Sequence, residues 1–404
     1  MINFNEALKL IESLKIDTLG FSRIFINECV GRILYDNIKA KDDNPKFDTS
    51  NMDGYAFCYD DLNLLKNDGL EIDSINKAGN SYIREIKNGK CIKTFTGSKM
   101  PINADSIAIV EQVEVKNNKI FLKDNEVINK GQHIRKKGQN YKKGDVLLKK
   151  NRIISAFDIG ILAQNNNILI DVYNKPKIGI LSSGDELIEI GETPKSDNFI
   201  YSSNNHILKA IVQSLGSEAR LYPILEDSKE NTKNAISNVL KDNDILITTG
   251  GMSKGDFDFV KEIINNFGEC IFNDVKIKPG KAISYIKCKN NKHIFALPGN
   301  PTSSVISFIL FGRLILQKMF GITPYIPTHK AKLLNNIDNS KDTRLEFIIS
   351  NIFIKNGFYE VELKRNRLSY MINDFNGAMV IIEQKCYKKG DLVDIILLNN
   401  LLSL

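Results

Sequence analysis

Residues 177–187 read KIGILSSGDEL, residues 244–256 read DILITTGGMSKGD, and residues 293–304 read HIFALPGNPTSS. In each segment a short apolar run ends in a loop that contains glycine. Between these segments the apolar residues recur at helical spacing, as in SNNHILKAIVQSLG at 203–216. Alternation of strands and helices is typical of a parallel sheet with helices on both faces. The sequence therefore predicts an α/β domain over residues 176–325.

The rest of the chain has a different character. Short apolar runs separated by Asn, Gly and Asp turns fill residues 49–130, which predicts a small, mostly β domain. The chain begins with an amphipathic pattern, MINFNEALKLIESLKI, which predicts a first helix. The basic segment 131–150 and the helical pattern that follows it either link domains or return to the first one. Residues 326–404 again hold strand-like runs, which predicts a small β-barrel or sandwich.

Composition and charge narrow the class of protein. The chain has 404 residues, 42% of them apolar, which is too long for one core and favours several folded domains. The net charge is +7, but the lysines are interspersed with acids and lack interleaved aromatic residues. A small anionic ligand explains this charge as well as nucleic acid does, so we predict no nucleic-acid partner.

The most apolar run and the cysteines argue for a protein of the cytoplasm. Residues 305–320 include Arg313 and Lys318 and fall short of the roughly 18 residues that a membrane span needs. We therefore predict a buried helix and no membrane partner. The six cysteines show no paired spacing, which indicates reduced thiols.

The three glycine loops are the best candidates for a binding site. Ligands of open α/β sheets bind outside the carboxyl ends of the strands, where backbone N–H groups and helix N-termini favour anions. Glycine lets the backbone approach an oxyanion closely, and serine hydroxyls add donors. One such loop is weak evidence, but three at one edge favour function. The candidate binding residues are Ser182, Gly184, Asp185, Gly250, Gly251, Ser253, Pro298, Gly299, Asn300 and Pro301.

Charged residues near these loops suggest a cation and a second anion contact. Asp185 and Glu186 lie in the first loop, and a hard cation such as Mg²⁺ suits carboxylates beside a phosphate ligand. Asp256 after the second loop is as suited to capping the next helix as to binding metal. Lys278 and Lys281 flank a Pro-Gly turn, which would hold two ammonium groups close together.

One alternative uses a different chemistry. Residues 251–255, GMSKG, match the nucleophile motif G-x-S-x-G, and Asp274 and His293 follow in the order of an α/β-hydrolase triad. Ser253 would then be the nucleophile of a serine hydrolase. This reading leaves the other two glycine loops unexplained.

Taken in order, the motifs resemble those of the molybdopterin molybdenumtransferase family, MoeA and the gephyrin E domain. The family phrase around M-D-G-Y-A appears as SNMDGYA at 50–56, and its T-G motif and acidic phrase appear as FTGSKMP and ADSIAIVEQ. The loops LSSGDEL, TTGGMSKGD, IKPGKAIS and LPGNPTS resemble the family's loops in the same order. The resemblance covers nearly the whole chain.

The resemblance implies a four-part subunit. Its parts are a split N-terminal domain (1–48 and 131–175), a small β domain (49–130), the α/β molybdopterin-binding domain (176–325) and a C-terminal β-barrel (326–404). It also implies a cytoplasmic homodimer. The implied reaction takes adenylylated molybdopterin and molybdate, releases AMP and leaves molybdenum on the dithiolene sulfurs, with Mg²⁺ as cofactor. The implied transient partners are a molybdopterin adenylyltransferase and apo-molybdoenzymes.

Residue roles carry over from the same resemblance. Asp53 and Thr96 of one subunit would face the α/β loops of the other, and Asp53 and Glu186 would contact metal or substrate. Thr96 and Ser253 would donate hydrogen bonds, and Lys278 and Lys281 would bind the anion. The catalytic candidates are Asp53, Thr96, Glu186, Asp227 and Asp258.

Two positions depart from the family pattern. Where the family often has an acid after its R-x-x-G motif, this chain has Asn140, which cannot neutralise a metal but can form hydrogen bonds. Four residues before Lys278 the family usually has a base, and this chain has Asp274.

The gephyrin resemblance also permits a non-catalytic pterin-binding scaffold. Asp53, Thr96 and Glu186 favour an enzyme over this alternative, because a scaffold has no need of acids beside an anion site.

Overall fold

The computed structural model describes residues 1–79, 84–225, 229–251, 260–339, 341–363 and 377–401. The chain forms two compact units. Unit 1 comprises Met1–Tyr35, Asn151–Ser155 and Leu169–Leu404, and unit 2 comprises Asp36–Lys150 and Ala156–Ile168. The α/β multidomain class predicted from the sequence is confirmed. The four predicted domain boundaries stay predictions.

Unit 1 contains a six-stranded sheet at its centre. In spatial order its strands are β16 (Glu218–Leu221), β13 (Lys177–Ser182), β17 (Ile245–Thr249), β21 (His293–Leu297), β20 (Ser284–Cys288) and β18 (Gly268–Asn273). Neighbours from β16 to β21 are parallel, whereas β20 runs antiparallel to both β21 and β18. The prediction of a parallel sheet is wrong for β20, which runs antiparallel to both of its neighbours. Only residues 289–292 separate β20 from β21, and a parallel crossover needs about a dozen residues.

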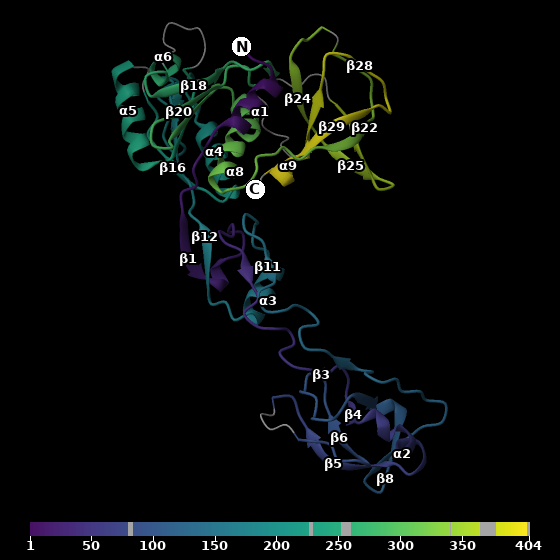
Figure 1. Ribbon diagram of the computed structural model, residues 1–404. Coiled ribbons are helices and arrows are strands. Elements are labelled where there is room, and N and C mark those ends of the chain that lie inside the picture. The colour runs from purple at the N-terminus through teal and green to yellow at the C-terminus, as the bar shows by residue number, and fades with distance from the viewer. Residues whose placement is uncertain (80–83, 226–228, 252–259, 340, 364–376, 402–404) are drawn as a thin grey trace. The chain divides into compact units, whose positions relative to one another are not determined.

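Helices cover both faces of this sheet, as predicted (Figure 1). Ile245 and Ile247 of β17 pack on the face that holds helices α1, α4, α7 and α8. Leu246, between them, packs on the face that holds α5 and α6, because successive side chains of a strand point to opposite faces. The helices are α1 (Phe4–Ser13), α4 (Ser203–Ser214), α5 (Lys229–Asp242), α6 (Val260–Ile264), α7 (Pro301–Ser307) and α8 (Arg313–Met319).

The most apolar run of the chain is a buried helix, as predicted. Helix α7 continues through a π-helical segment, η4 (Phe308–Gly312), into α8. Arg313 is only 1% exposed, and its Nη1 donates to the Tyr325 carbonyl oxygen at 2.9 Å. Among the helices that the structure describes, none is long and apolar enough to cross a membrane.

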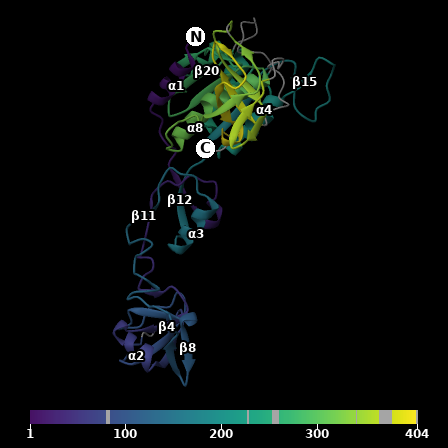
Figure 2. The same cartoon turned by 90° about the vertical axis from the view of Figure 1, so that its right-hand side faces the viewer.

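The predicted first helix, α1, lies beside α8 in both views (Figures 1 and 2). Its Ala7 and Ile11 are buried in the core of unit 1. Lys318 Nζ of α8 donates to the carbonyl oxygens of Glu12 and Leu14 at 2.8 and 2.7 Å. A cation at the C-terminus of a helix satisfies carbonyl groups that have no partner within the helix.

The C-terminal part of unit 1 is a seven-stranded mixed sheet. Strand β19, which lies in the chain between β18 and β20 of the α/β sheet, pairs in parallel with β24 and so joins the two sheets. Closure into a barrel stays a prediction. In spatial order the strands are β19 (Ile277–Lys278), β24 (Leu345–Ser350), β27 (Ala378–Ile382), β29 (Leu392–Leu397), β22 (His329–Leu333), β26 (Phe358–Val361) and β25 (Ile352–Lys355).

Unit 2 is mostly β, as predicted for residues 49–130. Its six-stranded sheet has the order β7 (Ser106–Ile109), β4 (Gly54–Phe57), β6 (Lys90–Thr94), β5 (Leu70–Asn76), β9 (Lys119–Leu122) and β8 (Val113–Lys116). Three two-stranded pairs, the first in unit 1 and the other two in unit 2, show that the chain after residue 131 returns to its beginning. They are β1 (Phe21–Phe25) with β12 (Leu169–Tyr173), β2 (Ile38–Lys39) with β11 (Val146–Leu148), and β3 (Thr49–Ser50) with β10 (Ile134–Arg135).

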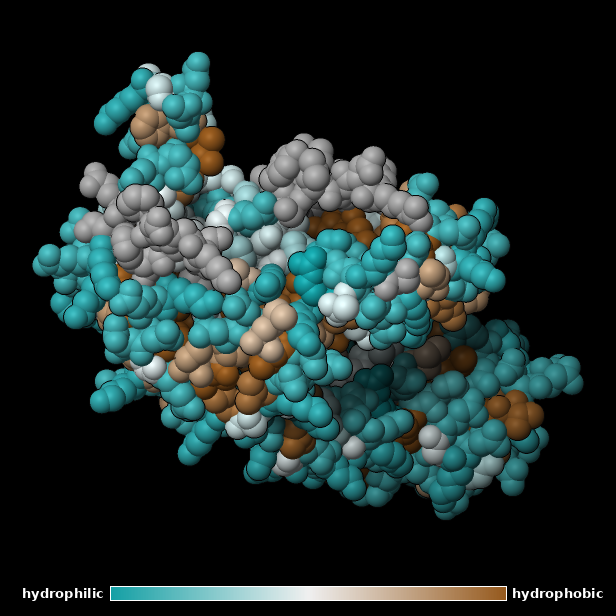
Figure 3. All heavy atoms as spheres, turned by 90° about the horizontal axis from the view of Figure 1, so that it is seen from above, coloured by the Kyte–Doolittle hydropathy of each residue, from teal (hydrophilic) through white to brown (hydrophobic). Residues whose placement is uncertain are grey.

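On the face seen in Figure 3, hydrophilic residues predominate and apolar residues form separate groups between them.

Shorter elements complete the chain. The remaining elements are η1 (Ile26–Glu28), η2 (Tyr59–Asp61), α2 (Leu62–Asn67), η3 (Val110–Gln112), α3 (Ala156–Gln164), β14 (Leu187–Ile188), β15 (Ile200–Tyr201), β23 (Ile337–Asp338), β28 (Cys386–Tyr387) and α9 (Leu398–Leu401).

Candidate active site

The three glycine loops begin at one edge of the α/β sheet. Strands β13, β17 and β21 are parallel neighbours, and their last residues are in register: Ser182 pairs with Thr249, and Thr249 pairs with Leu297. The Ser183 N–H then donates to the Thr249 carbonyl oxygen at 3.0 Å. The loops that follow these strands therefore start side by side.

Glycine is required at position 250, where the second loop touches the first. A Cβ atom on Gly250 would lie 2.4 Å from the Ser183 carbonyl oxygen, and one on Gly299 would lie 3.5 Å from Gly250 Cα. Gly250 and Gly251 also have positive φ angles, 89° and 62°, which other residues rarely adopt. The structure thus places the first, second and third loops side by side at one edge of the sheet, and the ligand-binding roles of their residues stay predictions.

Beneath the loops lies a buried polar cluster that the sequence analysis missed in part. Ser182 Oγ is 2.7 Å from Thr249 Oγ1 and donates to Asn205 Oδ1 at 2.5 Å. Asn204 Nδ2 donates to the Gly299 carbonyl oxygen at 2.7 Å. Asn204 and Asn205 start helix α4, so the sequence presented them only as the polar beginning of a helix. This cluster ties α4 to all three strand ends.

Several polar atoms of this region are buried without a partner. In the part of the chain that the structure describes, Ser183 Oγ, Ser202 Oγ, Thr248 Oγ1, Asn204 Oδ1 and Asn205 Nδ2 accept or donate no hydrogen bond. Each such atom costs about 1–3 kcal/mol unless water or a ligand satisfies it. So many at one sheet edge favours a ligand site.

The two acids of the first loop are both exposed. A Cβ atom on Gly184 would lie 2.8 Å from Glu186 Oε2, so this carboxylate lies against the loop backbone. Within the described ranges, no group of three or more His, Cys, Asp or Glu side chains could hold a metal ion. Mg²⁺, however, commonly uses one or two carboxylates and substrate phosphates, and Asp185 and Glu186 fit that donor set. Four other candidates, Asp227, Ser253, Asp256 and Asp258, lie outside the described residues.

The third loop leads directly into helix α7. Asn300 caps the helix, with its Oδ1 accepting from the Ser303 N–H at 3.4 Å, and Pro301 takes the first helical position. Ser304 Oγ donates to the Pro298 carbonyl oxygen. The two prolines and the cap therefore fix the path of this loop, and Gly299 between them is exposed.

The Pro279-Gly280 turn packs beside the third loop. A Cβ atom on Gly280 would lie 2.3 Å from Ser307 Oγ of α7, and Ser307 Oγ donates to the Gly280 carbonyl oxygen at 3.3 Å. Lys281 follows on the surface, and its side chain has no ion pair or hydrogen bond within the described residues. The Lys281 side chain is therefore exposed beside the Pro279-Gly280 turn.

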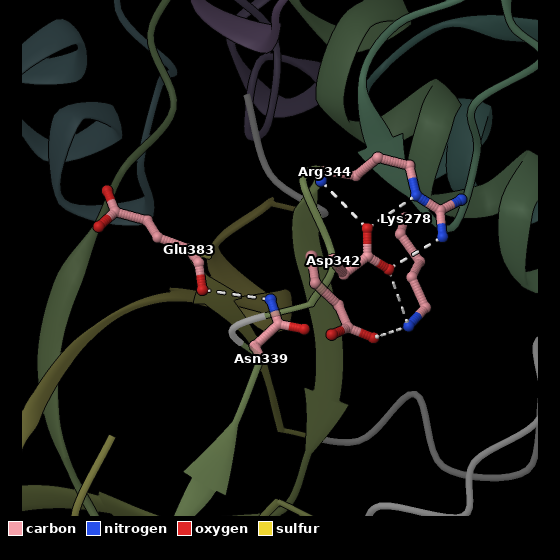
Figure 4. A network of polar contacts seen from close by, with 6 residues as sticks. Lys278, Asn339, Asp342, Arg344 and Glu383 are labelled. Atoms are coloured by element: carbon pink, nitrogen blue, oxygen red, sulfur yellow. Dashed lines mark hydrogen bonds and ion pairs between the residues drawn. The ribbon is translucent and has the colours of Figure 1, made fainter. Parts of the chain in front are cut away.

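Lys278 differs from Lys281, because carboxylates already hold it (Figure 4). Its Nζ lies 3.0 Å from Glu346 Oε1 and 3.3 Å from Asp342 Oδ2. Burial favours the neutral amine, but these two carboxylates outweigh it, and the pKa of Lys278 is raised. The Arg344 guanidinium also binds Asp342 at 2.9 and 3.0 Å and holds the pKa of that carboxyl well below its usual range. The predicted anion-binding role of Lys278 stays a prediction.

In unit 2, the structure brings Asp53 and Thr96 together. Asp53 Oδ1 accepts from the Thr96 N–H and from Thr96 Oγ1, both at 2.8 Å. These two bonds, the backbone one first, lower the pKa of Asp53. Both residues are exposed, so the carboxylate is charged and open to a ligand. Arg135 lies in the neighbouring strand β10 and donates to Asn51 Oδ1 at 3.2 Å.

The two departures from the family pattern have local partners. Asn140 Nδ2 donates to Asn44 Oδ1 at 2.6 Å, so the amide forms a hydrogen bond as expected. Asp274 has a φ angle of 53° and forms an ion pair with Lys261 at 3.1 Å.

The geometry does not support the serine hydrolase. His293 is the first residue of β21, whereas the loops follow its last residue, Leu297. At about 3.3 Å per residue these ends lie roughly 13 Å apart. His293 is also fully buried, its Nδ1 lies 2.9 Å from Tyr285 Oη, and burial lowers its pKa to about 4. Its imidazole is therefore remote from the glycine loops.

Comparisons with known proteins agree on the identity of both halves. Residues 2–165 match the MoeA N-terminal region (domain I and II), and residues 179–318 match a probable molybdopterin binding domain. A putative molybdopterin biosynthesis protein of Methanocaldococcus jannaschii is 33% identical, covering 92% of this chain and 91% of that protein. A molybdopterin molybdenumtransferase of Nostoc is 30% identical, covering 82% and 77%. The crystal structure of a molybdopterin biosynthesis MoeA protein from Pyrococcus horikoshii has a TM-score of 0.81 at 29% identity, covering 98% and 100%.

Proposed function

The chain belongs to the MoeA family, and from this we propose that it is a molybdopterin molybdenumtransferase, an enzyme that makes molybdenum cofactor. Its substrates are adenylylated molybdopterin and molybdate. The dithiolene thiols replace two molybdate oxygens, which leave as water, and one water is consumed as the phosphoanhydride breaks to release AMP. The observation that carries this proposal is the side-by-side position of the first, second and third loops at Ser183, Gly250 and Gly299.

The loops suit this chemistry because it needs positioning more than a protein nucleophile. Molybdate and phosphate are oxyanions, and backbone N–H groups and the exposed Lys281 can bind them. Ser182, Gly184, Gly251, Asn300 and the prolines of the third loop shape the site. Holding two reactants in a fixed relative position replaces a bimolecular encounter with an effectively unimolecular step.

Mg²⁺ is the proposed cofactor. Asp185 and Glu186 would hold it, together with Asp53 from a second subunit, and the ion would offset the negative charge of the pyrophosphate. The exposure of these carboxylates supports this assignment, since Mg²⁺ prefers oxygen ligands, and the pKa of Asp53 is lowered by its two hydrogen bonds from Thr96.

A homodimer is proposed with it. In this arrangement Asp53 and Thr96 of one subunit face the α/β loops of the other. The exposure of Asp53 and Thr96 supports it, because an exposed carboxylate oriented by two hydrogen bonds is suited to a ligand from outside the unit. A molybdopterin adenylyltransferase and apo-molybdoenzymes are the proposed transient partners, and the cytoplasm is the proposed location.

The alternatives receive no support. The relatives are named as transferases, which does not favour a hydrolase or a scaffold that only binds pterin. For Asp227, Asp258 and Ser253 the proposal rests on the family motifs alone.

The test is molybdate-dependent AMP release from adenylylated molybdopterin with Mg²⁺, measured by chromatography. We expect release by the intact protein and a loss of about a hundredfold or more in Asp53→Ala and Glu186→Ala, because each removes a charge at the reacting phosphates. Circular dichroism checks that both variants are folded. Binding of pterin without AMP release by the intact protein would overturn the proposal in favour of a scaffold.

A further inference from the structure

Two adjacent asparagines connect the start of helix α4 to the candidate site. Asn205 accepts from Ser182, which also contacts Thr249, so this amide fixes the ends of β13 and β17. Asn204 donates through Nδ2 to the carbonyl oxygen of Gly299 in the third loop. The pair therefore holds strand ends and loop together from below.

In each of these two amides, only one of the oxygen and nitrogen atoms forms a hydrogen bond within the described residues. Asn204 is 9% exposed and Asn205 is fully buried, and in the described part of the chain Asn204 Oδ1 and Asn205 Nδ2 have no partner. Ser202, which precedes α4, gives no side-chain cap to the helix, and its buried hydroxyl is also unpartnered. A folded protein rarely leaves buried polar atoms unsatisfied, and these three belong to neighbouring residues at the start of α4, one of which bonds to the third loop.

The chemistry of Asn204 decides what kind of group it can bind. The Gly299 carbonyl oxygen only accepts hydrogen bonds, so the Asn204 atom facing it must be the donor Nδ2. The remaining atom is then the acceptor Oδ1, which requires an N–H or O–H donor. Molybdate and phosphate esters at neutral pH offer acceptors almost exclusively. Asn204 therefore suits a part of the substrate other than its oxyanions.

We propose that Asn204 binds the nitrogen heterocycle of the substrate, by accepting a hydrogen bond from a ring N–H or amino group. Asn205 acts as a positioning residue that holds Asn204, Ser182 and Thr249 in place. This inference rests on the proposed function, because adenylylated molybdopterin carries two such rings, a pterin and an adenine. Both offer the same donor chemistry.

The experiment measures binding of four probes to the full-length protein by calorimetry. 6-Hydroxymethylpterin and AMP carry a heterocycle, whereas ribose 5-phosphate and molybdate carry none. In Asn204→Ala we expect affinity for one heterocyclic probe to fall about tenfold, the value of one hydrogen bond, and affinity for ribose 5-phosphate and molybdate to stay within about twofold. The probe that loses affinity identifies the ring.

A second variant separates recognition from simple damage to the fold. Asn204→Asp keeps an acceptor for the heterocycle but adds a negative charge beside the loops. It should retain more heterocycle affinity than Asn204→Ala and should weaken molybdate binding. A purely structural role would lower both affinities in both variants.

The matched control is Asn243→Ala. Asn243 is another buried asparagine with an unpartnered Oδ1, but it precedes β17 at the opposite end of the strand. Unchanged heterocycle affinity in Asn204→Ala, or an equal loss in Asn243→Ala, overturns the inference while the proposed function stands. If the unmodified protein binds neither heterocycle, the proposed function itself fails, and the inference with it.

Discussion

Gly299 lies directly against Gly250: a Cβ atom built on Gly299 would be 3.5 Å from Gly250 Cα, and one built on Gly250 would be 2.4 Å from the Ser183 carbonyl oxygen. The two glycines come from loops almost fifty residues apart in the sequence. The first, second and third loops therefore lie side by side at the carboxyl ends of their strands, which is where ligands of open α/β sheets bind.

Gly250→Ala should destabilise unit 1. The added Cβ overlaps the Ser183 carbonyl oxygen, and the φ angle of 89° is unfavourable for alanine. Together these effects should lower the free energy of unfolding by about 2–4 kcal/mol, measured by urea denaturation. Gly160→Ala is the control, because nothing lies within 4 Å of its Cβ position in helix α3. Equal stability of the two variants would contradict the close contact of the loops.

Thr96→Val should raise the pKa of Asp53. The substitution removes the hydroxyl donor and keeps the backbone N–H, so the smaller of the two hydrogen-bond contributions that lower the pKa of Asp53 is lost. Carboxyl carbon chemical shifts followed from pH 2 to 7 measure this pKa. Asp171, whose pKa is lowered by Arg23 instead, serves as the internal control. An Asp53 that titrates in its ordinary range in the unmodified protein would contradict the bonded pair.

Glu346→Gln should weaken the attachment of the C-terminal sheet. The carboxylates raise the pKa of Lys278 in the folded protein, so its protonated form stabilises the fold. This contribution to the free energy of unfolding is complete below the unfolded pKa of about 10.4 and is lost as pH rises through the raised folded pKa. The variant should lose about 1 kcal/mol at pH 7, discounted because the Lys278 side chain is 42% exposed, and less at high salt.

The control for this measurement is Lys330→Met. Its ion pair with Asp394 is 62% and 45% exposed on the two sides, so its loss should change stability by no more than about 0.5 kcal/mol. Equal effects of the two substitutions on urea denaturation would show that the Lys278 pairs carry no special weight.

His293 should make the fold sensitive to mild acid. Burial lowers the pKa of His293 in the folded protein to about 4. As pH falls below about 6.5, this histidine is therefore protonated in the unfolded chain but still neutral in the folded protein. The stabilisation is therefore complete above pH 6.5 and is lost between there and pH 4, by about 2–4 kcal/mol. In His293→Gln this dependence should disappear, as measured by urea denaturation at several pH values. A slope unchanged in the variant would assign the acid sensitivity to other groups.

The sequence predicts the position of a site residue when that position follows directly from the strand that precedes it. The three loops could be predicted because parallel strands end at one edge, whatever the rest of the fold does. The reversed direction of β20 was missed, since the pattern of apolar residues does not give strand direction. The short turn at residues 289–292 was the available signal.

The sequence did not predict side-chain partners that come from segments far apart in the chain. Lys278 and Asp342 are 64 residues apart, and the sequence around Lys278 does not indicate that carboxylates form ion pairs with it. Asn204 and Asn205 looked like an ordinary polar helix start. Asp53 and Thr96 could be paired only through the family resemblance, because 43 residues separate them.

The most direct test of the central claim compares molybdate-dependent AMP release by the unmodified protein, Gly299→Val and Gly160→Ala. Gly299 is exposed and has no positive φ angle, so valine there is compatible with folding but fills the space between the second and third loops. The account predicts release by the unmodified protein and by Gly160→Ala, and a loss of about a hundredfold in folded Gly299→Val. AMP release by Gly299→Val at the rate of the unmodified protein would contradict the claim that these loops form the active site.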